Sequence, residues 1–156
     1  MVAYFIVHFV KRPRVKLDIH ALDNICNIVH NTHVKWTIQF HEEFDSEFDV
    51  LPEKVQNEML ARAKLLEQFG PRLGRPSVDT LNGSNHANMK ELRFDVADGV
   101  WRVAFAFDPK RKAILLVCGD KSGISEKRFY KQLIAKADKR FDEHLVRLKK
   151  ERQEKL

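Results

Sequence analysis

Cysteine is scarce in this sequence, and the two cysteines present, Cys26 and Cys118, lie far apart in apolar surroundings. Neither belongs to a CxxC pair or to another spacing that holds zinc, so the sequence implies neither a disulfide framework nor a zinc site. His20, His30 and His33 also match no metal-binding motif. We therefore expect free thiols in a reducing compartment, no metal and no cofactor.

Long apolar runs are missing as well, because no segment reaches the roughly 20 residues that span a membrane. Residues 1–10 are apolar, but basic residues follow them, whereas a secretory signal carries its charge before the apolar stretch. The sequence also lacks a P-loop, a dinucleotide-binding glycine motif, a zinc-protease motif and a nucleophile elbow. These absences favour a cytoplasmic protein that makes no contact with a membrane.

Positive charge, in contrast, is plentiful: the formal net charge is +6 and the isoelectric point is about 9.4. A basic surface favours polyanionic partners such as RNA, DNA, acidic lipid or an acidic protein. The alternative is a solvated basic surface on an ordinary domain. Charge alone therefore favours a nucleic acid only slightly.

The chain divides into three parts by composition and periodicity. Residues 1–33 form an atypical N-terminal extension that holds four of the seven histidines. Residues 34–148 carry a continuous pattern of strands and helices, which predicts one domain with a modest core. Residues 149–156 are mostly charged and are expected to fray.

The first half of the domain predicts a strand and two helices. Residues 34–40 alternate apolar and polar side chains, as a half-buried strand does. Phe44 and Phe48, four residues apart, indicate a helical turn with one apolar face. Pro52 suits the start of a longer helix that ends at Gly70. Its apolar stripe consists of Val55, Met59, Ala63, Leu66 and Phe69.

The second half predicts three strands and a last helix. Residues 89–95 and 100–107 alternate in character, and Asp98-Gly99 between them is a hairpin-turn signal. Residues 113–118 are almost entirely apolar, as a strand covered on both faces is. Ser125 suits the N-cap of the last helix. The predicted class is α+β, with a mostly antiparallel sheet, two helices before most of its strands and one helix after them.

Basic and polar side chains gather on one face of this predicted sheet and at its rims. Arg93 and Arg102 face the same side in the expected register, and the small Ala104 and Ala106 beside Arg102 favour a groove. The other candidates lie at the strand ends and at the start of the last helix. They are Lys90, Lys121, Lys127, Arg128 and Tyr130.

Such a set of side chains can cleave RNA without a metal ion. The 2′-OH loses a proton and attacks the adjacent phosphate, arginine or lysine stabilises the charged transition state, and the 5′-oxygen receives a proton. Glu91 and His86 are candidates for the proton acceptor by residue type only. The alternative is structural: Arg93 pairs with a neighbouring carboxylate, Arg102 is an ordinary surface residue, and the helix residues form a solvated face.

Three ordered motifs resemble one known family. The segments 89–94 (MKELRF), 101–105 (WRVAF) and 119–121 (GDK) are similar in order and spacing to the RelE/HigB toxin superfamily, and most to its phage-derived, HigB-like branch. The resemblance runs from about residue 35 to residue 145. It implies the RelE-like microbial RNase fold and ribosome-dependent cleavage of mRNA, which inhibits translation.

The resemblance also implies partners and roles for individual residues. A HigA-like antitoxin with a helix-turn-helix is the expected partner, beside the ribosome and mRNA, and operator DNA is reached only through that antitoxin. Arg102 matches the arginine of the family's middle strand, and Lys121 matches the basic residue that leaves the last strand. From the residue chemistry and the resemblance together, we predict two sets of site residues. The predicted catalytic residues are Arg102, Lys121, Arg93, Glu91 and Tyr130, and the predicted RNA-binding residues are Lys90, His86, Lys127 and Arg128.

Two departures from the family pattern qualify this assignment. Glu91 stands where a lysine is expected, which leaves the proton acceptor open. Residues 1–33 have no counterpart in the family, and we interpret them as a mis-called start or a dispensable extension. Two other functions remain open: a ParE-like toxin that inhibits gyrase without cutting RNA, and an inactive prophage-derived protein that only binds its antitoxin or DNA.

Overall fold

The computed structural model describes residues 35–155. The N-terminal extension, with its histidines and Cys26, lies outside the described residues. The described part forms one five-stranded sheet with helices on both faces. The α+β class predicted from the periodicity is confirmed.

The sheet has the strand order β1-β5-β4-β3-β2. β1 runs parallel to β5, and the other neighbours are antiparallel, so the expectation of a mostly antiparallel sheet is confirmed. β5 lies between β1 and β4, which explains its nearly continuous apolar sequence. The strands are β1 (Thr37–Phe40), β2 (Val78–Thr80), β3 (Met89–Val96), β4 (Gly99–Phe107) and β5 (Lys112–Asp120).

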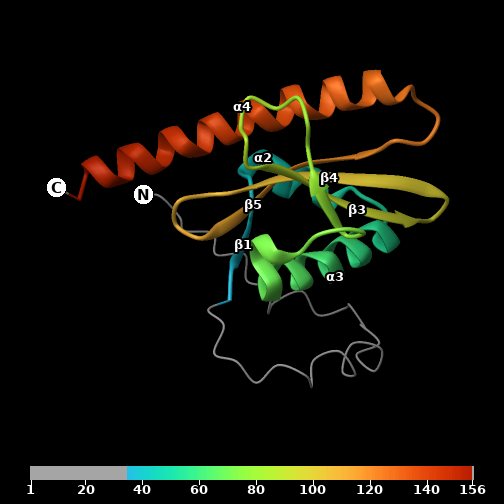
Figure 1. Ribbon diagram of the computed structural model, residues 1–156, viewed down its shortest axis with the longest axis horizontal. Coiled ribbons are helices and arrows are strands. Elements are labelled where there is room, and N and C mark those ends of the chain that lie inside the picture. Colours follow the sequence, from blue (N-terminus) through green and yellow to red (C-terminus); the bar gives the residue numbers. More distant parts are fainter. Residues whose placement is uncertain (1–34, 156) are drawn as a thin grey trace.

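The helices lie on opposite sides of this sheet (Figure 1). The long C-terminal helix α4 (Glu126–Gln153) crosses one face, and α3 (Glu53–Phe69) lies against the other. The short helix α2 (Glu42–Asp49) follows β1 and contacts β5, and a 3-10 turn, η2 (Gly70–Arg72), ends α3. The charged segment after residue 148 continues α4 as far as Gln153.

Two apolar clusters, one on each face, hold the layers together. The cluster on the α3 side contains Phe44, Met59, Leu66, Val103 and Phe105 among its buried members. The cluster on the α4 side contains Met89, Ala104, Ala106, Phe129, Leu133, Ala137 and Phe141. Both faces of the sheet therefore carry a packed core, and the face that carries Arg93 and Arg102 is covered by α4 at Ala104 and Ala106.

Three local features differ from the predictions. β2 was not predicted, because three residues are too few to show an alternating pattern. The β3–β4 turn consists of Ala97 and Asp98, both with positive φ, and Gly99 already belongs to β4. Gly99 is required by packing, because an added Cβ would overlap the Trp101 indole. Ser125 is the N-cap of α4, but its side chain makes no capping hydrogen bond within the described residues.

A buried arginine ties α4 to α2 and to an irregular place in the sheet. The β4–β5 register shifts between Ala104 and Phe105, so Leu116 is an extra residue in β5. Arg140 of α4 is 2% exposed and donates to the Leu116 carbonyl oxygen at 2.7 Å. The same guanidinium donates to Glu43 and Glu47 of α2. These bonds satisfy the buried charge and fix the position of α4 over the sheet.

Candidate functional site

Arg93 and Arg102 are directly opposite each other in the β3–β4 ladder. Residues opposite each other in an antiparallel pair share one face, so both side chains lie on the α4 side of the sheet. Asp79 of β2 accepts a hydrogen bond from Arg93 Nη1 at 3.1 Å. The observed register of β3 and β4 therefore places the two arginines on one face, as the sequence predicted.

Arg102 is more buried than the sequence indicated. It is 6% exposed, and its Nη1 donates to its neighbour's carbonyl oxygen, that of Trp101, at 2.7 Å. The carboxylate of Asp95 lies 3.7 Å from the same nitrogen. Its Nε is buried and has no hydrogen-bond partner among the described residues. The interpretation of Arg102 as an ordinary surface residue is therefore wrong.

The groove expected beside Arg102 is absent at Ala104 and Ala106. Both alanines are fully buried in the cluster beneath α4. Their small size lets α4 pack close to β4, and Phe129 and Leu133 of α4 belong to the same buried cluster. In this part of the described chain, alternation identified the face correctly but could not show that a helix covers it.

Glu91 lies two residues before Arg93 on the same strand face and is 5% exposed. Its Oε1 accepts a hydrogen bond from the Tyr130 hydroxyl at 3.3 Å and lies 3.8 Å from Arg93 Nε. Its Oε2 is buried and has no partner within residues 35–155. Burial raises the pKa of Glu91 above its ordinary value, and the hydrogen bond from Tyr130 and the charges of Arg102 and Arg93 only partly oppose this.

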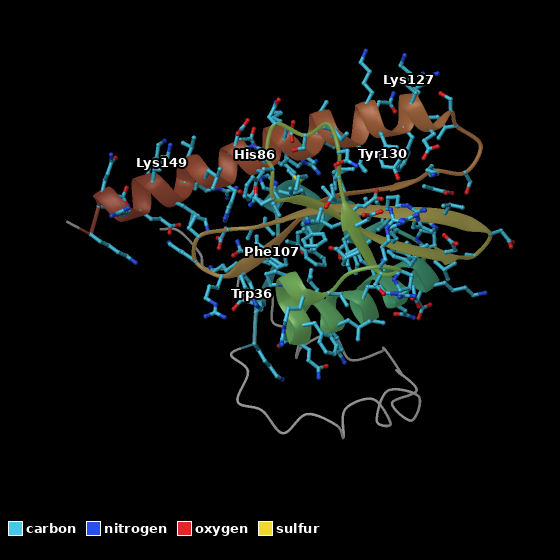
Figure 2. All side chains as sticks on the ribbon, viewed as in Figure 1. Trp36, His86, Phe107, Lys127, Tyr130 and Lys149 are labelled. Carbon is cyan, nitrogen blue, oxygen red and sulfur yellow. The ribbon has the colours of Figure 1, made fainter. Side chains whose placement is uncertain are left out.

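Tyr130 and Lys121 complete the cluster from the start of α4 and the end of β5. Figure 2 shows Tyr130 between α4 and the sheet. Lys121 Nζ lies 5.6 Å from the centre of the Tyr130 ring and 2.9 Å from Glu126 Oε1. Burial, with the charge of Glu91, raises the pKa of Tyr130, and a hydrogen bond from Arg102 only partly opposes this. The hydroxyl therefore keeps its proton at neutral pH.

We call Glu91, Arg93, Arg102, Lys121 and Tyr130 the site cluster. All five were predicted from the sequence as catalytic residues. The structure brings them together from β3, β4, the end of β5 and α4. They combine a buried carboxyl group, a neutral phenol and three cations. That combination can accept a proton, donate a proton and stabilise an anionic phosphorus centre.

An open cleft of about 420 Å³ adjoins the two arginines at the edge of β3. Sequence reasoning missed two of its arginines, Arg62 of α3 and Arg75 of the loop before β2. It also missed Asp79, because β2 was not predicted. The lining residues are Arg62, Arg75, Pro76, Arg93, Phe94, Asp95 and Arg102.

The four predicted RNA-binding residues do not join the site cluster. Lys90 lies on the opposite face of β3 from Arg93, and its Nζ donates to Thr80 Oγ1 at 2.9 Å. His86 Nε2 lies 2.9 Å from Asp142 Oδ1, halfway along α4. Lys127 points away from the sheet, and Arg128 beside it is exposed (Figure 2). His86 therefore lies apart from the site cluster, and Glu91 is the candidate proton acceptor within it.

The described part of the chain shows no candidate metal site and no reactive thiol. Within residues 35–155, no group of three or more histidine, cysteine, aspartate or glutamate side chains is placed to hold a metal ion. Cys118 is a free thiol, and burial raises its pKa to about 12, so it is not a nucleophile at neutral pH. None of the described helices combines the length and apolar content of a membrane span.

Comparison with known proteins places the chain in a family. Residues 46–142 match the family described as phage derived protein Gp49-like. The chain belongs to the Gp49-like family. This Gp49-like chain is 40% identical over 114 residues to the protein named as toxin HigB2 of Mycobacterium tuberculosis. That alignment covers 72% of this chain and 56% of HigB2, so the chain spans little more than half the length of that relative.

A second relative supports the same assignment. The protein named as toxin HigB3 of Mycobacterium tuberculosis is 53% identical over 82 residues, which are 53% of the Gp49-like chain and 69% of HigB3. Among solved structures, an E. coli RelE toxin mutant in the free state covers 65% of the chain and 96% of its own length, with 13% identity and a TM-score of 0.45. The HigB-like resemblance of the three strand motifs is thus confirmed by the family match and the two relatives.

Proposed function

We propose that this Gp49-like chain is the toxin of a toxin–antitoxin pair and that it cleaves mRNA on the ribosome, which inhibits translation. The names of its relatives HigB2 and HigB3 support the toxin assignment. The observation that carries the nuclease assignment is the contact of Tyr130 with Glu91, beside the opposed Arg93 and Arg102. A proton acceptor, a proton donor and two anion-binding groups thus lie within one cluster.

The proposed reaction begins when the Glu91 carboxylate accepts the proton of a ribose 2′-OH. The 2′-oxygen then forms a bond to the adjacent phosphorus, and Arg93 and Arg102 stabilise the negative charge on the phosphoryl oxygens. The bond from phosphorus to the 5′-oxygen breaks, and Tyr130 donates a proton to the leaving oxygen. The products are a 2′,3′-cyclic phosphate and a 5′-hydroxyl.

The raised pKa of Glu91 suits the role of proton acceptor. A carboxyl group with an ordinary pKa is a weak base, and burial strengthens its basicity by disfavouring the ionised form. Lys121 supplies a further cation beside Tyr130, where it favours loss of the phenolic proton during the transfer. The two arginines already provide the positive charge that a metal ion supplies in other nucleases, so the proposed reaction needs no metal.

The proposed partners follow from the family. A HigA-like antitoxin with a helix-turn-helix inactivates the toxin and connects it to operator DNA, and the ribosome presents the mRNA. The names HigB2 and HigB3 support an antitoxin partner in general. A reading frame for a small helix-turn-helix protein beside this gene is the expected genetic context.

The test is induced expression followed by mapping of new mRNA 5′-ends. We expect growth arrest with in-frame breaks for the wild type, loss of both for Glu91→Gln, and retention of both for Arg152→Gln, an exposed residue far along α4. Growth arrest without mRNA breaks overturns the nuclease proposal and favours a ParE-like gyrase inhibitor. Cleavage by purified toxin and ribosomes is expected to survive EDTA concentrations that the ribosome tolerates, and loss there contradicts the metal-free reaction.

A further inference from the structure

We propose that the cleft at the edge of β3 binds the phosphodiester backbone of single-stranded RNA next to the bond that is cut. The inference rests on the proposed function for the identity of the ligand. It assigns a substrate-positioning role to Arg62 and Arg75, which lie outside the site cluster.

The charge of the cleft fits a phosphate chain. Four guanidinium groups and one carboxylate, that of Asp95, line it. Arginine binds phosphate through paired N–H donors, and several arginines along one groove follow a nucleic-acid backbone. A volume of about 420 Å³ is within the range of small-ligand sites.

The two new arginines are held in place by the fold. Arg62 Nε donates to Glu58 on the same helix at 2.8 Å, and its Nη1 donates to Ser77 Oγ at 2.9 Å. Arg75 Nη2 lies 2.6 Å from Asp79, which also accepts a bond from Arg93. A guanidinium carries five N–H donors, so within the described residues both keep donors for a ligand.

A second observation favours an anionic ligand for the cleft. Arg102 is more than nine-tenths buried and lines the cleft, yet its Nε has no partner among the described residues. An unsatisfied buried donor on a charged group is costly, and native structures rarely keep one without a functional reason. The guanidinium of Arg102 is thus incompletely paired beside the cleft, and a phosphate bound there would compensate its charge.

The position of the cleft relates it to the site cluster. Arg93 and Arg102 belong to both, with Glu91 and Tyr130 on one side and Arg62 and Arg75 on the other. An RNA strand that lies in the cleft therefore contacts Arg93, whose Nε lies 3.8 Å from Oε1 of the proposed proton acceptor Glu91. Holding the neighbouring phosphate fixes the reacting phosphate for in-line attack.

The test measures binding separately from cleavage. The probe is a fluorescein-labelled single-stranded oligonucleotide with 2′-O-methyl riboses, which cannot be cut by 2′-OH attack, and the readout is anisotropy over a series of salt concentrations. The variants are Arg62→Gln, Arg75→Gln and their combination. Arg72→Gln is the matched control, because Arg72 is exposed, belongs to the adjacent η2 turn and does not line the cleft.

We expect the double variant to bind about tenfold more weakly at low salt and to lower the slope of log K against log salt by about 1.4, since each lost phosphate contact on a single strand contributes about 0.7. Arg72→Gln should leave the slope unchanged. An unchanged slope and affinity in the folded double variant overturn the inference, even where mRNA is cut. If the wild-type protein cuts no mRNA but the variants bind the oligonucleotide more weakly, RNA binding by the cleft is supported and only the nuclease proposal is overturned. If the double variant does not fold, Arg75→Gln alone is measured, because the largely exposed Arg75 side chain can be replaced without disturbing the core.

Discussion

Arg93 and Arg102 face each other across the β3–β4 ladder, so two cations occupy positions where like charges repel. Asp79 accepts a hydrogen bond from Arg93, whereas the carboxylate nearest Arg102, that of Asp95, lies 3.7 Å away and the buried Nε of Arg102 has no partner among the described residues. A fold selected for stability alone would place an opposite charge or an apolar residue there. The arrangement is typical of a functional site that is maintained at a cost in stability.

Arg102→Gln is expected to separate stability from activity. The substitution removes the like-charge pair and the unsatisfied Nε, so the free energy of unfolding should stay the same or rise by about 0.5 kcal/mol. Cleavage of mRNA on ribosomes should fall at least about 100-fold, the usual effect of removing one oxyanion donor. Urea unfolding and single-turnover cleavage measure the two effects. A destabilisation well above about 1 kcal/mol would show that Arg102 is structural.

Glu91→Gln should change the pH dependence of stability. Burial raises the pKa of Glu91 in the folded protein, so the folded state binds this proton more tightly than the unfolded chain does. Wild-type stability is therefore expected to fall as the pH rises through the folded pKa of Glu91, and the neutral glutamine should not show that loss. Urea unfolding of both proteins between pH 4 and pH 8 tests this. A stability difference that does not grow with pH would contradict the raised pKa.

Glu91 should also determine the acidic limb of the pH profile of the cleavage rate. If Glu91 accepts the 2′-OH proton, the rate rises with pH until the carboxyl group is ionised, with an apparent pKa above the ordinary value of 4.5. Glu91→Gln should remove the limb together with most of the activity. Glu154→Gln is the control, because Glu154 is exposed at the C-terminal end of α4 and does not belong to the site cluster. An intact acidic limb in the folded Glu91→Gln protein would assign the base elsewhere.

Glu47→Gln should weaken the attachment of α2 to α4. The hydrogen bond from Arg140 lowers the pKa of Glu47 from 4.5 to about 2. The contribution of Glu47 to stability is therefore complete above the pKa that this group has in the unfolded chain, and it is lost as the pH falls toward about 2. We expect a loss of about 1 kcal/mol at pH 7, reduced by the partial exposure of Glu47. The difference from the wild type should shrink between pH 4.5 and pH 2, whereas Glu154→Gln, at an exposed position, should have no effect at either pH.

Gly70→Ala should destabilise the protein without touching the site cluster. Gly70 has φ of 53°, and an added Cβ would overlap the indole of Trp36. Backbone strain and overpacking together should cost about 2 kcal/mol or more. Gly74→Ala, four residues away, is the matched control, because no described atom lies within 4 Å of its added Cβ. Similar melting temperatures for the two variants would contradict the close approach of Trp36.

Much of the fold could be predicted because its signals are local. The alternation of residues 100–107 identified the two faces of β4, and the spacing from Val55 to Leu66 identified the buried stripe of α3. β2 is too short for a periodic signal and is a strand because β3 pairs with it. The parallel β1–β5 pair joins segments more than 70 residues apart, which local patterns cannot match.

The sequence by itself determined the secondary structure apart from β2, the α+β class and the common face of Arg93 and Arg102, because side-chain direction follows from strand periodicity. Only the tertiary structure decided that α4 covers that face, that Glu91 is buried against Tyr130, and that Arg62 and Arg75 meet the two central arginines in one cleft. Those relationships depend on the packing of elements from distant parts of the chain. Burial, and with it the pKa of Glu91, is a property of that packing rather than of any local pattern.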